Sequence, residues 1–181
     1  MDELKINQTR LRLVRGNIVE QKVEAIVNAA NSQLAGGGGV DGAIHRAAGT
    51  RELLELTKSL GGCPTGSAVI TRAAKLPPPI KYIIHAVGPV YHDGKRGEAE
   101  LLAGAYTRSL ELADEKAVQS VAFPAISTGV YGYPMQAAAL VTLNAAVKYV
   151  QTHPATSLKE ILFVLYDVGP LQRYERELQK L

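Results

Sequence analysis

The chain has 181 residues, of which 46% are hydrophobic and 20% are charged, and this composition is that of a globular protein with enough apolar material for a core. The formal net charge of +3 suits an anionic ligand, but no run of lysine and arginine indicates a nucleic-acid-binding protein. The only cysteine, Cys63, excludes an intramolecular disulfide and a cysteine-based zinc site.

Strand-like and helix-like patterns alternate along the whole chain. In chain order the hydrophobic pattern predicts a strand at 11–15, a strand at 25–28, helices at 40–48 and 50–60, strands at 68–71 and 82–87, a helix at 98–116, a strand at 120–123, a helix at 135–150, a strand at 161–166 and a helix at 171–181. Gly49 is expected to end the first helix, and Thr50 to cap the second. This alternation predicts a single domain over 1–181, a three-layer α/β/α sandwich with a mixed, mainly parallel central sheet.

The cellular compartment of the protein is inferred from its cysteine count and its hydropathy. A single cysteine favours a reducing compartment, so we expect a cytoplasmic protein. The N-terminal residues form no secretory signal, and no run of 18 apolar residues predicts a membrane span. Cys63 precedes Pro64 in a glycine-rich turn, where nothing activates a thiol, so we expect it to be inert.

Four consecutive glycines, Gly36 to Gly39, run directly into the predicted helix 40–48. Such a loop exposes backbone amides, and a helix N-terminus favours an anion, so the segment predicts a phosphate site; a flexible turn is the alternative. Gly37, Gly39 and Gly42 also match the dinucleotide pattern G-x-G-x-x-G. Seven residues, 29–35, separate the strand from the glycine run, and no acidic strand end follows, so we interpret the match as accidental.

Polar side chains surround this loop. Asp41 and His45 lie four residues apart and share one helix face, which favours a catalytic pair, although a helix-packing histidine and a carboxylate serving the helix dipole are the alternatives. Asn28 and Asn31 bracket two alanines at the strand end. One of them is expected to stabilise the turn, and the other to hydrogen-bond ligand hydroxyls.

A second loop, Phe123 to Pro134, has the sequence FPAISTGVYGYP. Ser127, Thr128 and Gly129 offer hydroxyls and a flexible backbone after a strand, which again suits phosphate. Two such loops at one edge of the sheet predict two phosphates or one diphosphate. Tyr131 is expected to cover a sugar or ring, or else to anchor the loop, and Tyr166 to stack on a base, or else to pack in the core.

Together these segments resemble the macrodomain family, in particular its MacroD-type branch. The resemblance covers nearly the whole chain and is carried by the segments Gly16–Ile18, Ala25–Asn31, Gly36–Gly49, Ile83–Pro89 and Phe123–Pro134.

The resemblance implies a site for ADP-ribose and a role for each matching residue. Asn31 would hold the terminal ribose, Asp41 and His45 would lie near its anomeric carbon, and Tyr131 would cover it. The diphosphate would be wrapped by the loop residues Gly38, Gly39, Val40, Ser127, Thr128, Gly129 and Val130. Tyr166 would flank the adenine and Asn17 would contact its amino group, and Ile18 and Asn28 are expected among the other ligand-binding residues. Neither a metal nor another cofactor is implied.

The implied activity is hydrolysis of esters at the terminal ribose. Its substrates would be mono-ADP-ribose on acidic side chains of proteins and O-acetyl-ADP-ribose. The alternative is a non-catalytic reader of ADP-ribose, but family readers commonly lack the aspartate and histidine that this chain has at Asp41 and His45. We expect a monomer whose partners are ADP-ribosylated proteins. Nucleic acid is not expected as a partner, although ADP-ribosylated ends stay open as substrates.

One position departs from the family pattern. Asn17 stands where the family usually has an aspartate that contacts the adenine amino group. An asparagine oxygen accepts the same hydrogen bond without charge assistance. We therefore expect weaker adenine affinity or selectivity, but not loss of binding.

Overall fold

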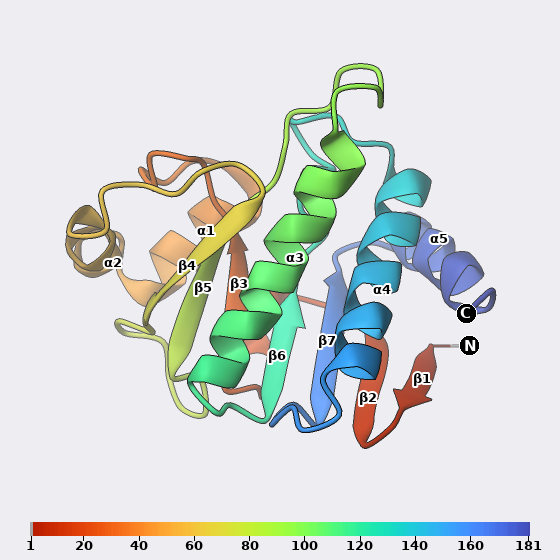
Figure 1. The fold of residues 1–181 in the computed structure, drawn as a ribbon. Helices are drawn as coiled ribbons and strands as arrows, with labels where there is room; N and C mark the ends of the chain where they lie inside the picture. Colours follow the sequence, from red (N-terminus) through yellow and green to blue (C-terminus); the bar gives the residue numbers. More distant parts are fainter. Residues whose placement is uncertain (1) are drawn as a thin grey trace.

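A computed structural model describes residues 2–181, which form one seven-stranded sheet with helices on both faces (Figure 1). The strands are β1 (Glu3–Ile6), β2 (Thr9–Arg15), β3 (Ala25–Ala29), β4 (Ser67–Arg72), β5 (Tyr82–Val87), β6 (Ser120–Phe123) and β7 (Glu160–Leu165). The helices are the 3₁₀ turn η1 (Ile18–Glu20), α1 (Gly39–Ala48), α2 (Thr50–Lys58), α3 (Glu98–Glu115), α4 (Met135–Thr152) and α5 (Val168–Leu178).

The sheet order is β1-β2-β7-β6-β3-β5-β4. The five central strands run parallel to one another, whereas β1 and β4 pair antiparallel at the two edges. The predicted mixed, mainly parallel sheet is thus confirmed. Each parallel step needs a crossover, and these crossovers supply the helices that cover the sheet.

Side chains alternate between two apolar cores on the two faces of the sheet. On β7, Ile161 and Phe163 face the larger core under α3, α4 and α5, while Leu162 and Val164 face the core under α1 and α2. This alternation is the period of two that a strand imposes, and it accounts for strands that are apolar throughout. The three-layer arrangement is therefore confirmed.

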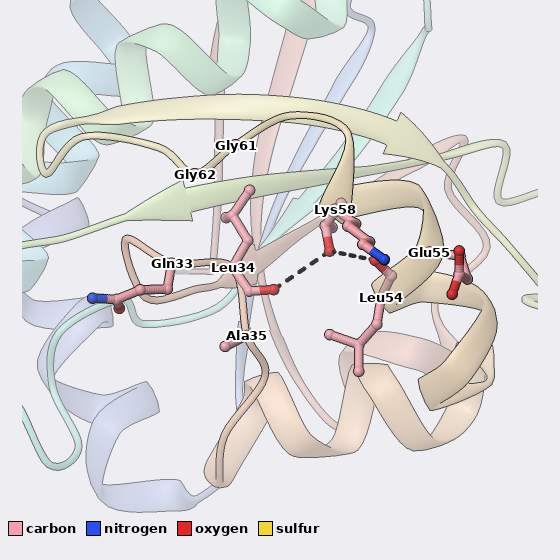
Figure 2. A pocket seen from close by; sticks show the side chains of 9 residues that line it. Gln33, Leu34, Ala35, Leu54, Glu55, Lys58, Gly61 and Gly62 are labelled. Carbon is pink, nitrogen blue, oxygen red and sulfur yellow. Dashed lines mark hydrogen bonds between the residues drawn. The ribbon is translucent and has the colours of Figure 1, made fainter.

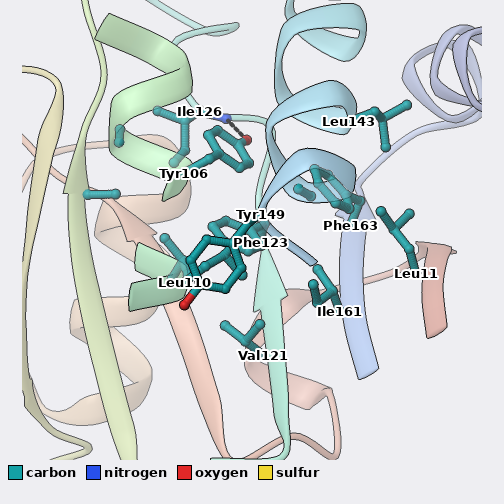
Figure 3. Packing of buried hydrophobic residues seen from close by; sticks show 14 of the residues in the cluster. Leu11, Tyr106, Leu110, Val121, Phe123, Ile126, Leu143, Tyr149, Ile161 and Phe163 are labelled. Carbon is teal, nitrogen blue, oxygen red and sulfur yellow. Dashed lines mark hydrogen bonds between the residues drawn. The ribbon is translucent and has the colours of Figure 1, made fainter. Parts of the chain in front are cut away.

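Aromatic side chains fill the centre of the larger core (Figure 3). The Phe123 ring stacks on Tyr106, with centroids 4.6 Å apart, and on Phe163, with centroids 5.6 Å apart. The Tyr106 hydroxyl is also hydrogen-bonded, because it donates to the Pro124 carbonyl at 2.7 Å and accepts from the Ile126 amide at 3.3 Å. This core therefore fixes the first residues of the loop that follows β6.

All predicted strands and helices are present, with ends shifted by a few residues. The structure adds β1 and η1, which the sequence analysis did not predict. The prediction of Thr50 as an N-cap is wrong: Gly49 caps α2 and Thr50 is its first residue. Gly49, with φ of +87°, is the only residue between α1 and α2 and caps both helices. Thr50 therefore lies inside α2. Tyr166 follows β7 instead of ending it.

The carboxyl ends of the five parallel strands lie along one edge of the sheet (Figure 1). Every segment singled out in the sequence leaves a strand at this edge. Asn17 follows β2, Tyr166 follows β7, the Ser127 loop follows β6, and the Asn31 loop follows β3. Within residues 2–181, no helix is long and apolar enough to cross a membrane.

Candidate active site

The loop after β3 is held in shape by Asn31. Its Nδ2 atom donates to the Gly36 carbonyl at 2.8 Å, and its Oδ1 atom accepts from the Ala35 amide at 3.1 Å. Asn31 is thus the turn-stabilising asparagine of the pair. Its amide still has a second N–H and a second lone pair, so the predicted ribose contact stays a prediction.

The same loop is braced from behind by α2. The Thr57 hydroxyl lies 3.4 Å from the Leu34 carbonyl and 3.2 Å from the Leu54 carbonyl, so its one proton is shared between them, and Figure 2 shows these contacts at a pocket between the loop and α2. The pocket has a volume of about 510 Å³, and none of the predicted site residues lines it. It therefore backs the loop and is not the candidate site itself.

The glycine-rich segment packs tightly against the first turn of α1. Gly38 is the N-cap, and a Cβ atom on Gly42 would lie 2.6 Å from the Gly37 carbonyl oxygen. A Cβ atom on Gly37 would in turn lie 3.5 Å from Asp41 Oδ2. The loop amides and the start of α1 are therefore held next to the Asp41 carboxylate. Gly42 serves this packing, which gives the G-x-G-x-x-G match a role in the fold of this loop.

Asp41, His45 and Asn28 form one buried cluster. The Asp41 Oδ1 atom lies 3.2 Å from His45 Nε2 and accepts a hydrogen bond from Asn28 Nδ2 at 2.8 Å. The exposed fractions of Asp41 and His45 are only 6% and 4%. The predicted pairing of Asp41 with His45 on one helix face is confirmed, and Asn28 joins it from the end of β3.

Three buried polar atoms of the predicted site residues have no hydrogen-bond partner among residues 2–181. They are Asn28 Oδ1, His45 Nδ1 and Ser127 Oγ. Buried polar atoms are almost always hydrogen-bonded in folded proteins, and each exception costs stability. Three such atoms in the predicted site residues are suited to a polar ligand.

The loop after β6 has a strained conformation and a close neighbour. Ser127 has φ of +68°, and its side chain touches the position that a Cβ atom on Gly88 would occupy. The Thr128 hydroxyl donates to the Ala125 carbonyl at 2.7 Å, so it stabilises the turn. Val130 is fully exposed at the tip of the loop. These contacts assign Gly88, which follows β5, a part in shaping the predicted phosphate loop.

A neighbouring loop clamps the two tyrosines. Tyr133 is buried against Tyr91, with ring centroids 4.7 Å apart, and the Tyr91 amide donates to the Tyr131 carbonyl at 2.8 Å. Tyr133 is thus the tyrosine that anchors the loop. Tyr131 is only partly buried, so its ring is available for the predicted ribose contact.

Glu98, which the sequence analysis did not single out, organises that neighbouring loop. Its carboxylate is buried and accepts backbone N–H groups from four residues: His92, Asp93, Gly94 and Arg96. These hydrogen bonds lower the pKa of Glu98 to about 2. Nothing in the local sequence marks this role, because the partners are backbone amides.

The far end of the site lies where β2 and β7 end side by side. The Gly16 amide donates to the Leu165 carbonyl at 3.0 Å, which places Asn17 beside Tyr166. Tyr166 is 72% exposed, so the core-packing alternative is wrong for it. Ile18 is buried. Asn17 Oδ1 accepts the Val19 amide at 3.2 Å and so caps η1, which leaves one lone pair of that oxygen for a ligand.

Cys63 is buried, and burial raises the pKa of its thiol, as expected of an inert cysteine. Among the described residues, no three His, Cys, Asp or Glu side chains gather as a metal site requires.

The family model for the Macro domain matches residues 27–142. The chain belongs to the macrodomain family. It is 49% identical over 175 residues to a Macro domain-containing protein of Caldanaerobacter subterraneus, covering 95% of this chain and 97% of that protein. It is 48% identical over 172 residues to an O-acetyl-ADP-ribose deacetylase of Escherichia coli K12, covering 93% and 95% of the two chains.

Solved macrodomain structures are similar over almost the whole chain. The Oceanobacillus iheyensis macrodomain with ADP superposes with a TM-score of 0.89 at 38% identity, covering 98% of this chain and 94% of that one. The Trypanosoma brucei macrodomain in complex with ADP-ribose gives a TM-score of 0.84 at 36% identity, covering 93% and 68%. The macrodomain resemblance and its fold are thus confirmed, whereas the roles of the individual site residues stay predictions.

The packing of Gly42 against Gly37 gives a first testable prediction. Gly42→Ala places a methyl group 2.6 Å from a backbone carbonyl, so the glycine loop must shift. We expect a loss of about 1–3 kcal/mol of unfolding free energy in urea denaturation, together with weaker ADP-ribose binding by calorimetry. Gly169→Ala in α5 is the control, because its Cβ meets nothing within 4 Å and we expect no loss. Equal behaviour of the two variants would contradict the packing role.

The pKa of Glu98 gives a second prediction. A carboxylate whose pKa is lowered on folding stabilises the folded state at pH values above its ordinary pKa of 4.5. This contribution is lost as the pH falls from 4.5 toward the folded-state pKa of about 2. We expect Glu98→Gln to unfold more easily at neutral pH and to lose less stability than the native chain between these two values. Thermal unfolding across this pH range measures both. Glu100→Gln, in the same helix turn but exposed, should follow the native curve. Parallel curves for Glu98→Gln and the native chain would refute the assignment.

Proposed function

We propose that the chain binds ADP-ribose and hydrolyses esters at its terminal ribose. The substrates would be O-acetyl-ADP-ribose and mono-ADP-ribose on acidic side chains of proteins. The observation that carries the proposal is the buried Asp41–His45–Asn28 cluster directly beside the Gly36–Gly39 loop. The names of the relatives support it, since proteins of Citrobacter rodentium and Escherichia coli at 49% and 48% identity are called O-acetyl-ADP-ribose deacetylases.

The order of the strands supports an elongated ligand along the edge of the sheet. Asn17 and Tyr166 follow β2 and β7, the Ser127 loop follows β6, and the Asn31 loop follows β3. Adjacent strands lie about 4.8 Å apart, so about 14 Å separates β2 from β3. A base at the β2 end, a diphosphate at the β6 loop and a ribose at the β3 end follow this order.

Backbone groups would hold the diphosphate. The start of α1 presents amides and the positive end of a helix dipole; Gly38 is its N-cap, and Gly39 and Val40 are its first residues. Ser127 to Val130 would close the other side. Binding energy from the diphosphate and adenine would then position the terminal ribose against the buried cluster.

Asp41 would orient a water molecule and accept its proton, and His45 would share in positioning it. In the ester, the water oxygen forms a new bond to the acyl carbon, the ester C–O bond breaks, and the proton goes to the departing ribose oxygen. The products are ADP-ribose and a carboxylic acid. Amides of the glycine loop would stabilise the charge that develops in the transition state.

A direct release assay tests this proposal. The purified chain is incubated with a carrier protein ADP-ribosylated on glutamate, and free ADP-ribose is quantified by chromatography. We expect Asp41→Ala to lower the rate by about 10²–10⁴-fold while ADP-ribose binding persists. Asn31→Ala should lower the rate as well, and Asp93→Asn, in an exposed loop, should not.

The alternative is a reader that binds ADP-ribose without cleaving it. Calorimetric binding of ADP-ribose without release from either an acylated or a glutamate-linked substrate would favour the reader. Absence of both binding and release would refute the proposed ligand.

The departure at Asn17 gives a separate prediction. Asn17→Asp should strengthen ADP-ribose binding by about five- to tenfold, because a charged acceptor strengthens the hydrogen bond to the adenine amino group. Stability should not change, since aspartate caps η1 as well as asparagine does. Calorimetry with ADP-ribose and with its hypoxanthine analogue, which lacks the amino group, measures the effect. An equal gain for both ligands, or none for ADP-ribose, would contradict the assigned contact.

A further inference from the structure

A chain of buried polar side chains leads away from the candidate active site across the sheet. Asn28 on β3 lies opposite His85 on β5, and the Asn28 Nδ2 atom is 3.4 Å from His85 Nδ1. On the other side of the ring, His85 Nε2 is 3.0 Å from the Thr71 hydroxyl of the edge strand β4. Asn28 also donates to Asp41, so the chain joins an edge strand to the candidate catalytic carboxylate.

The direction of each hydrogen bond follows from proton counting. The Thr71 hydroxyl has one proton, and it donates this proton to the Arg72 carbonyl at 2.9 Å. With its proton on the Arg72 carbonyl, Thr71 accepts from His85, and this pattern places the ring proton on Nε2. Burial, with a smaller contribution from His45, lowers the pKa of His85 to about 3, so the ring is neutral and its Nδ1 atom is an acceptor.

An acceptor at His85 Nδ1 decides which way the Asn28 amide is turned. Its NH₂ group must face both His85 and Asp41, and this leaves Asn28 Oδ1 without a partner among the described residues. The reverse orientation would place the amide oxygen against the Asp41 carboxylate. The Asp41 carboxylate and the acceptor at His85 Nδ1 thus favour the same rotamer, in which Asp41 receives a hydrogen bond.

We propose that Thr71 and His85 are positioning residues that fix the Asn28 amide and, through it, the Asp41 carboxylate. This inference rests on the proposed function in so far as Asp41 is the group that acts on the water. Neither residue belongs to the predicted ligand contacts. Thr71 lies on the edge strand, two side chains beyond Asn28.

Removing the Thr71 hydroxyl without changing its shape isolates the effect. In Thr71→Val the His85 Nε2–H has no acceptor, so the ring favours a proton on Nδ1. An Nδ1 proton opposes the Asn28 NH₂ group beside it, so we expect the amide to turn its oxygen to His85, and Asp41 then loses the Asn28 donor and keeps only His45. The loss of about one hydrogen bond should lower the release rate about tenfold, with the ADP-ribose Kd unchanged within about threefold. Thr71→Ser, which keeps the hydroxyl, should restore the rate.

Nitrogen-15 NMR of the imidazole rings provides a test that is independent of turnover. We expect His85 to carry its proton on Nε2 in the native chain and in Thr71→Ser, and to lose this tautomer in Thr71→Val, with a shift of the Asn28 side-chain amide signals. Thr142→Val is the matched control, because it removes a fully buried hydroxyl on α4 away from the site. It should destabilise the chain comparably without changing the His85 signals or the rate.

The possible outcomes separate the two proposals. If the native chain releases no ADP-ribose, the proposed function fails, and the tautomer and amide signals still decide the positioning chain. A His85 proton on Nδ1 in the native chain, or Asn28 amide signals that do not move in Thr71→Val, would overturn the inference. So would a rate in Thr71→Val that falls no further than in Thr142→Val.

Discussion

The parallel pairing of five buried strands is the constraint on which the site depends. Parallel neighbours need a crossover between them, so all five carboxyl ends emerge at the same edge, and each of them begins a loop there. Register matters equally. Asn28 and His85 face each other because β3 and β5 pair in one particular register, and a slip of one residue would point these side chains to opposite faces of the sheet.

Hydrogen bonds from behind hold the loops after β3 and β5 in shape. Asn31 closes the loop after β3, Thr57 of α2 holds the Leu34 carbonyl, and Glu98 gathers four backbone amides of the loop that clamps Tyr131. The candidate site itself lowers the stability of the fold, because it leaves buried polar atoms without partners. Of the four buried side-chain atoms without a partner within residues 2–181, three belong to predicted site residues. Each such atom costs about 1–3 kcal/mol, an expense that suits a binding site better than a core.

Local patterns predict the fold well and the supporting contacts poorly. Buried strands and amphipathic helices carry their own signals, so every predicted element is found, and the Asp41–His45 pair follows from helical spacing. β1 was missed because it has only four residues: polar and apolar residues alternate in it, but an alternation this short is a weak signal. Glu98 acts through backbone amides. His85 acts through partners 14 and 57 residues away, and only its place in an otherwise apolar strand marks it.

An anion that is bound by backbone groups needs no lysine or arginine, so the charged residues of this sequence do not indicate where its ligand binds. None of the predicted site residues is lysine or arginine, although the chain has a net charge of +3. Amides at a helix start and in a glycine loop provide fixed partial charges without flexible side chains, so little entropy is lost when a diphosphate binds. The same absence of cations leaves Asp41 with an amide and an imidazole as its hydrogen-bonding neighbours. A strong counter-ion there would hold the carboxylate in an ion pair, whereas these weaker partners leave its second oxygen for a water molecule.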